Sequence, residues 1–452
     1  MGTITLRQAA QWCGGQIDEK YAEVSFFGAN NDSRNIEPGQ LFVALQGQRD
    51  GHDFIPMAME KGAAAVLCSR PVGDVPAIVV EDTRKALGDI ARGERQRIGM
   101  KVIGVTGSVG KSTTKEMICA VLSSTYRVSK TPANHNNDIG MPMAILGIPE
   151  NTQIAVLEMG MNHFGEISYL TSIAQPNVAV ITNIGTMHIE HLGSRQGILR
   201  AKLEILEGMP SDGRVILNGD DPLLWNVHHQ TFFRATYFGS QNPECDYLAS
   251  DIVQGHGRLC FDVRYGDLQF PVEMGLEGLH YVSDAMAAIS VGVELGVAPT
   301  AIRLALTLFE NMAGRQEISE HRGMTIIRDC YNAGPESMAA ALVVLGGRPG
   351  RRVAVLGDML ELGICAPAEH YRVGRIAAEN AEVVLAYGPN SNRVVSGAIT
   401  GGMSTAMVKG FTDQESLISA MKRMIKAGDV VLVKGSHGMQ MDQILDRFLA
   451  EK

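Results

Sequence analysis

Residues 101–115, which read KVIGVTGSVGKSTTK, constrain the fold more than any other stretch of this chain. An apolar run rich in β-branched residues leads into a glycine-bearing loop, and Lys111, Ser112 and Thr113 follow. This order is typical of a buried strand that delivers a polyphosphate-binding loop to the start of a helix. The loop is the shorter form G-x-x-G-K-S-T, because Val105 stands where the usual first glycine would be. An ordinary strand-to-helix turn is the alternative, but loop, lysine, hydroxyl and flanking pattern together favour phosphate binding.

Composition narrows the class of protein. The chain has 452 residues, which predicts about three domains, and a net charge of −9 without a long basic run, which argues against a nucleic-acid partner. The seven cysteines are scattered and form no Cys-x-x-Cys pair, which indicates a reduced chain without a zinc ribbon. The N-terminus lacks the apolar core of a signal peptide, and no apolar run approaches the roughly 20 residues of a membrane span. We therefore expect a cytoplasmic protein.

The pattern along the chain predicts an α/β protein of three domains. Residues 1–99 hold short strands and turns. Residues 100–314 alternate apolar strands with helices, as in a doubly wound, mostly parallel sheet, and include an antiparallel annex at 234–273. In residues 315–452 strands and helices alternate again, as in a Rossmann-like domain. In the last two domains the predicted strands lie at residues 154–157, 178–181, 215–217, 325–327, 353–356, 383–386 and 430–433. The predicted helices lie at residues 111–123, 196–207, 283–296, 336–345 and 414–427.

Polar residues follow the predicted strands of the middle domain, at the sheet edge where α/β proteins bind ligands. Glu158 ends one strand and is placed to hold Mg²⁺ opposite Ser112 or Thr113, although it can equally cap a helix or form an ion pair. His188 follows the next strand and is a candidate metal or phosphate ligand, although an isolated loop histidine is usually solvated. Lys202 lies on a predicted helix, and spacing alone predicts a solvated surface lysine.

Three polar loops also follow predicted strands of the last domain. They carry Asp329 with Tyr331 and Asn332, then Asp358 with Glu361, and then Lys434. Such loops line one crevice when the strands are parallel, whereas turn chemistry explains each of them singly.

Seven motifs resemble the Mur ligase family, ATP-dependent amide-forming enzymes of peptidoglycan precursor synthesis. They are DSRNIEPGQLFVAL, TGSVGKST, NHNNDIGMP, EMGMNHFGEI, YNAGPESM, VLGDMLELG and VLVKGS, spread over nearly the whole chain. The GDM-x-ELG pattern resembles the branch that adds D-alanyl-D-alanine to a UDP-muramoyl tripeptide, and the Asp-Asn-Pro-Arg signature of the branch that adds meso-diaminopimelate is absent.

The resemblance implies a role for each matching residue. It implies catalytic roles for Lys111, Glu158, His188 and Lys202, with Lys202 carbamoylated. It implies two Mg²⁺ ions held by residues among Ser112, Thr113, Glu158, His188 and the carbamate of Lys202. It implies ATP contacts by Thr106, Gly107, Ser108, Val109, Gly110, Lys111, Ser112, Thr113, His280, Asp284, Arg315 and Asp329. It implies a UDP site at Ser33, Arg34, Phe42, Ala44 and Gly47, and peptide or dipeptide contacts by Asn137, Asn162, His163, Tyr331 and Asn332. It also implies a monomer that passes through an acyl phosphate.

Some residues depart from the family pattern. Tyr281 and Asp284 replace two asparagines of a His-Asn-x-x-Asn-Ala run, and Arg328, Gly334 and His437 replace a common aspartate, asparagine and arginine. A paralogue with another amine substrate, such as a folyl-polyglutamate or cyanophycin-type ligase, and a weakly active nucleotide-binding partner protein are therefore alternatives. A P-loop motor is disfavoured, because no Walker-B-like aspartate lies in the apolar strand context expected for it.

Overall fold

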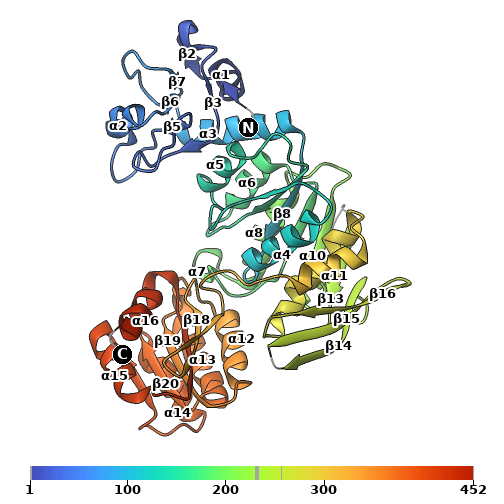
Figure 1. Cartoon of the computed structure of the whole chain (residues 1–452), viewed down its shortest axis with the longest axis vertical. Coiled ribbons are helices and arrows are strands. Elements are labelled where there is room, and N and C mark those ends of the chain that lie inside the picture. Colours follow the sequence, from blue (N-terminus) through green and yellow to red (C-terminus); the bar gives the residue numbers. More distant parts are fainter. Residues whose placement is uncertain (1–2, 230–233, 256, 451–452) are drawn as a thin grey trace.

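The computed structural model describes residues 3–229, 234–255 and 257–450, and three α/β parts follow one another along the molecule (Figure 1). The N-terminal and C-terminal parts lie at opposite ends of the view, and the part that carries the glycine-bearing loop lies between them.

The N-terminal part is built on a small sheet that is parallel except for one edge strand. In sheet order its strands are β2 (Gln16–Ile17), β7 (Ala77–Val79), β6 (Ala65–Cys68), β5 (Leu41–Val43) and β4 (Ala29–Asn30). Outside this sheet, β1 (Ile4–Thr5) pairs with β3 (Ser25–Phe26), and the helices are α1 (Leu6–Cys13), α2 (Ile55–Glu60) and α3 (Thr83–Ile98). Leu41 and Val43 pack into one apolar cluster and Phe42 into another, because successive residues of a strand point to opposite faces.

The middle part contains a nine-stranded sheet. In sheet order its strands are β16 (Leu268–Met274), β15 (Arg258–Tyr265), β14 (Tyr247–Gly255), β13 (Arg234–Gly239), β12 (Arg214–Asn218), β11 (Val178–Ile181), β8 (Lys101–Thr106), β10 (Ile154–Glu158) and β9 (Val128–Lys130). Its helices are α4 (Lys111–Ser123), α5 (Gly140–Leu146), α6 (Glu166–Ala174), α7 (Ile189–Leu192), α8 (Arg195–Leu203), α9 (Pro222–Trp225), α10 (His280–Glu294) and α11 (Pro299–Thr307). Val102 packs on one face of the sheet, and Ile103 and Val105 pack on the other, where α4 and α10 lie. Burial on both faces explains why these strands are apolar throughout.

The C-terminal part has a six-stranded sheet whose only antiparallel strand is at one edge. In sheet order its strands are β17 (Glu317–His321), β18 (Met324–Asp329), β22 (Asp429–Lys434), β19 (Arg351–Gly357), β20 (Val383–Tyr387) and β21 (Val408–Phe411). One face packs against α12 (Pro335–Gly346), α13 (Ala366–Asn380) and α14 (Ser391–Thr400), and the other against α15 (Gln414–Met424) and α16 (Met441–Ala450). This arrangement confirms the predicted doubly wound α/β domain.

The structure corrects three predicted elements. The strand at the start of the predicted annex, β13, pairs in parallel with β12 and extends the main sheet, and only β14, β15 and β16 pair antiparallel. The helix predicted at 283–296 begins earlier, at His280, and the helix predicted at 196–207 ends at Leu203 and continues as a 3₁₀ turn. Among the described residues, no helix is long and apolar enough to cross a membrane.

Candidate active site

The glycine-bearing loop joins β8 to α4, and its neighbours fix its shape. Gly107 has a φ of 152° and Gly110 a φ of 85°, and both lie against side chains that a Cβ would overlap, Thr182 and Asp284 respectively. Asn183 holds the loop between them: its backbone oxygen accepts from the Ser108 N–H at 3.0 Å, and its side-chain oxygen accepts from the Val109 N–H at 2.9 Å. The loop is thus rigidly shaped, with the first N–H groups of α4 directed toward the carboxyl end of the sheet.

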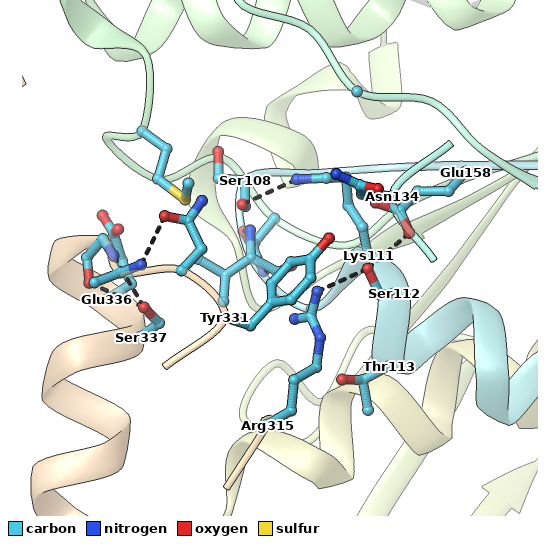
Figure 2. Close-up of a pocket in the computed structure, with 18 of the residues that line it drawn as sticks. Ser108, Lys111, Ser112, Thr113, Asn134, Glu158, Arg315, Tyr331, Glu336 and Ser337 are labelled. Carbon is cyan, nitrogen blue, oxygen red and sulfur yellow. Dashed lines mark hydrogen bonds between the residues drawn. The ribbon is translucent and has the colours of Figure 1, made fainter. Parts of the chain in front are cut away.

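A hydroxyl, a carboxylate and a guanidinium meet at the start of α4. The Ser112 hydroxyl donates to Glu158 Oε2 at 2.7 Å and accepts from Arg315 Nη2 at 2.9 Å, and Asn136 donates to Glu158 Oε1 at 2.9 Å. Figure 2 shows Arg315 reaching Ser112 from the segment that precedes the C-terminal sheet, with the ring of Tyr331 4.1 Å from its guanidinium carbon. Residues far apart in the sequence therefore converge on the serine of the loop.

Two lysines lie close to this group. Lys111 Nζ donates to the Gly107 carbonyl at 2.9 Å, and its pKa is lowered by burial, which the charge of Glu158 opposes. Lys202 is 2% exposed, so the interpretation from spacing, a solvated surface lysine, is wrong. Burial holds the pKa of Lys202 well below its usual value, and the nearby charge of Lys111 lowers it further.

His188 meets a carboxylate of the C-terminal part. Its Nδ1 lies 2.6 Å from Glu361 Oε2, and contact with His188 lowers the pKa of Glu361. Both residues adopt left-handed backbone conformations, with φ values of 62° and 61°. Within the described residues, no three histidine, cysteine, aspartate or glutamate side chains are grouped so as to hold a metal ion. Glu158 and His188 thus share the site without forming a ready-made metal cluster.

Buried ionisable groups surround the loop on the side of α10. Burial raises the pKa of Asp284 to about 7, although the hydrogen bond from Thr114, at 2.8 Å, and the charge of Arg315 oppose the shift. Burial lowers the pKa of His280 to about 4. Asp329 accepts from Lys434 at 2.7 Å.

Most of these groups border one cavity of about 530 Å³ between the middle and C-terminal parts. Sixteen sequence-predicted residues line it: Ser108, Val109, Gly110, Lys111, Ser112, Thr113, Asn137, Glu158, Asn162, His188, His280, Asp284, Arg315, Asp329, Tyr331 and Asn332. Thr106, Gly107, His163 and Lys202 are not part of its lining. His163 is mostly exposed, next to Glu166 and the ring of His191.

The three polar loops of the C-terminal part reach the cavity unequally. Asp329 and Lys434 line it, and Glu361 contacts His188, whereas Asp358 is buried and accepts from the backbone and side chain of Asn390 at 3.0 and 2.8 Å. The expectation that Asp358 lines the crevice is therefore wrong, because its carboxylate ties two loops of its own domain together.

The residues predicted for a nucleotide in the N-terminal part lie outside this cavity. The side chains of Phe42 and Ala44 are in the core, at 1% and 0% exposure, so only their backbone can meet a ligand. Ser33 is also buried, while Arg34 is exposed and its guanidinium donates two hydrogen bonds to Asp32.

Glu336, Ser337 and Gln316 line the cavity, and the sequence pattern did not predict any of them as site residues. Glu336 stands in the first turn of α12 and accepts from Thr186 at 3.0 Å. A glutamate at a helix start is ordinary capping chemistry, so nothing in the sequence pattern distinguished it.

The site combines a loop shaped to bind phosphate, a carboxylate at the end of the neighbouring strand β10, and an arginine from the following domain. These features define a nucleotide-dependent enzyme of the α/β class. Three family models match the chain: Mur ligase family, catalytic domain, over residues 26–95; Mur ligase middle domain, over 105–292; and Mur ligase, glutamate ligase domain, over 314–437. The chain belongs to the Mur ligase family.

Individual relatives agree over the full length. The chain is 40% identical to UDP-N-acetylmuramoyl-tripeptide–D-alanyl-D-alanine ligase of Bacillus subtilis, over 98% of this chain and 97% of that protein. The crystal structure of MurF from Acinetobacter baumannii superposes with a TM-score of 0.91 at 32% identity, covering 100% of both chains. MurF ligase from Thermotoga maritima in complex with ADP superposes with a TM-score of 0.82 at 29% identity, covering 94% of this chain and 97% of that one.

Proposed function

We propose that this protein is an ATP-dependent ligase that joins D-alanyl-D-alanine to UDP-N-acetylmuramoyl-tripeptide and releases ADP and phosphate in peptidoglycan precursor synthesis. The observation that carries the proposal is the meeting of the loop serine, Glu158 and Arg315 in one shared cavity. The full-length relatives, named for this reaction, supply the substrates. We propose further that the protein acts as a cytoplasmic monomer, with domains at 1–99, 100–314 and 315–452.

The reaction begins with two anions that repel each other. The terminal carboxylate of the tripeptide attacks the γ-phosphate of ATP, and the products are ADP and an acyl phosphate. Lys111, the N–H groups of the loop and Arg315 reduce this repulsion and stabilise charge on the transferring phosphoryl group. The neutral amine of the dipeptide then attacks the activated carbonyl carbon and forms the C–N bond of a tetrahedral intermediate. This intermediate loses a proton from nitrogen, and its C–O bond to phosphate breaks, which releases phosphate and leaves the amide.

The oxygen atoms at the start of α4 fit Mg²⁺. Ser112 Oγ and Glu158 Oε2 are 2.7 Å apart, close to the roughly 3.0 Å between neighbouring ligands of an octahedral ion with bonds of about 2.1 Å. When bound, Mg²⁺ would neutralise phosphate charge there, with Thr113 and His188 as further candidate ligands.

Lys202 is suited to carbamoylation. Burial and the charge of Lys111 favour its neutral amine, the form that attacks CO₂, and a carbamate formed there would place a negative charge next to Lys111. We propose that this carboxylate supports a second Mg²⁺ ion.

The remaining predicted residues are assigned by their position. We propose that Ser33, Arg34, Gly47 and the backbone of residues 42–44 bind the UDP group in the N-terminal part. Asn137, Asn162, Tyr331 and Asn332 line the cavity and are proposed to contact the peptide or the dipeptide, with His163 at its margin. We propose that the C-terminal domain closes over the acyl phosphate and shields it from water.

Phosphate release tests the proposal directly. The purified protein is given ATP, Mg²⁺ and UDP-N-acetylmuramoyl-tripeptide, and a panel of amines is compared: D-alanyl-D-alanine, single D- and L-amino acids, and L-glutamate. We expect release with the dipeptide above all others. Stimulation by L-glutamate instead would favour a folyl-polyglutamate type of ligase. No release with any amine would favour a nucleotide-binding partner protein, for which the changed residues Tyr281 and Asp284 are the best support.

A further inference from the structure

Glu336 has one carboxylate oxygen with a partner and one without. Oε1 accepts from the Thr186 hydroxyl at 3.0 Å, whereas Oε2 is buried and has no hydrogen-bond partner among the described residues. A buried carboxylate oxygen left unpaired is unfavourable, so its retention beside a substrate cavity indicates a donor that arrives with the substrate.

The position of this carboxylate is fixed by both domains. Glu336 lies in the first turn of α12, where the helix start favours a negative charge. Its carboxyl group rests on Gly185, where a Cβ would come within 2.9 Å of it. The Gly185 N–H in turn donates to Ser108 of the phosphate-binding loop at 2.8 Å. The free oxygen is therefore held near the loop that carries the triphosphate.

The lysines and the arginine of the described lining are bonded elsewhere. Lys111 donates to loop carbonyls, Arg315 to Ser112, and Lys434 to Asp329. The other glutamates of the lining are also engaged: Glu158 by Ser112 and Asn136, and Glu166 by backbone N–H groups of residues 162 and 163. Glu336, a residue of the cavity lining, thus keeps one carboxylate oxygen without a partner and with capacity for a donor.

We propose that Glu336 binds the ammonium group of the incoming dipeptide and so determines that the acceptor is an amine. This inference rests on the proposed function. Phosphate and carboxylate groups are repelled at this oxygen, whereas an α-ammonium group, with a pKa of about 8, is mostly protonated at neutral pH and matches it in charge and in donors. The carboxylate orients the amine beside the loop where the acyl phosphate forms.

The test compares Glu336→Gln with wild type in phosphate release, and with Glu379→Gln, an exposed position on α13, as the control. The KM for D-alanyl-D-alanine should rise by about tenfold to a hundredfold in Glu336→Gln, because a charge-assisted hydrogen bond is lost. The KM values for ATP and UDP-tripeptide should stay unchanged. D-Lactyl-D-alanine, which has a hydroxyl in place of the amine, should inhibit wild type and variant nearly equally. Glu336→Asp, which keeps the charge, should retain more affinity for the dipeptide than Glu336→Gln.

Other results would overturn the inference. A rise in all KM values together would indicate a structural role, and a rise for UDP-tripeptide alone would assign Glu336 to the acid substrate. Unchanged kinetics would show that the free oxygen binds nothing in the reaction. Absence of dipeptide-dependent phosphate release in wild type would instead refute the proposed function, so the two failures are distinguishable.

Discussion

Asp284 makes the stability of this protein depend on pH in a defined direction. The residue is 6% exposed, and burial raises its pKa to about 7. Its Oδ1 accepts from Thr114 at 2.8 Å, and an asparagine at this position keeps that acceptor but cannot ionise. Asp284→Asn therefore removes the titration while preserving the hydrogen bond.

The magnitude follows from the difference in pKa between the folded and unfolded states. An unfolded aspartate ionises near pH 3.9, whereas Asp284 in the folded protein keeps its proton up to about pH 7. Its contribution to folding is therefore fully present below about pH 4 and is lost as the pH rises to 7. The difference between the folded and unfolded pKa values corresponds to at most about 4 kcal/mol of folding free energy. We expect Asp284→Asn to exceed wild type in stability by up to about 4 kcal/mol at pH 8, about 2 kcal/mol at pH 5.5, and almost nothing at pH 4.

Urea unfolding followed by tryptophan fluorescence between pH 4 and 8 measures this difference. Trp225 lies in the same domain as Asp284 and reports its unfolding. Asp267→Asn, in the exposed turn between β15 and β16, is the control and should follow wild type at every pH. Parallel stability curves for wild type and Asp284→Asn across this range would refute the reasoning, because they would show that burial does not perturb the carboxyl group. ATP affinity offers a second readout: it should fall with rising pH in wild type more than in Asp284→Asn, since an ionised Asp284 repels the triphosphate.

Three further predictions concern the active site. Glu158→Ala should lower turnover by about a hundredfold or more while changing stability by less than about 2 kcal/mol, and near-normal turnover at ordinary Mg²⁺ concentrations would remove Glu158 from the metal site. Lys202→Ala should be inactive and unresponsive to bicarbonate, whereas short carboxylic acids should restore part of the phosphate release; full activity of the bare variant would end the carbamate proposal. Small-angle scattering should show a smaller radius of gyration with a non-hydrolysable ATP analogue and UDP-tripeptide together than without ligands, and equal dimensions would count against closure of the C-terminal domain.

Local pattern was sufficient for the parts of the site that depend on a single strand and the loop after it. The predicted helix 111–123 coincides with α4, and the strand predicted at 178–181 coincides with β11. Glu158 was placed at the end of a strand, and β10 ends there. These successes have one cause: parallel strands bring the loops at their carboxyl ends to one edge of the sheet, so order along the chain predicts position in space.

Local pattern failed wherever a partner comes from another domain or from the far side of a helix. Lys202 has the spacing of a surface lysine and is nevertheless buried, because helix periodicity says nothing of what packs against each face. Asp358 follows a strand as Asp329 does, yet hydrogen bonds from Asn390 turn it into its own domain.

By itself, then, the sequence determined the α/β class, the phosphate-binding loop, the family and the edge of the sheet where chemistry takes place, because strand–loop–helix order is a local property of the chain. Only the tertiary structure decided that Glu361 meets His188, that Arg315 reaches Ser112, and that Glu336 accepts from Thr186 while its second carboxylate oxygen stays unpaired. Each of these contacts joins residues more than a hundred positions apart, and their distances depend on how two domains pack, which no local pattern encodes.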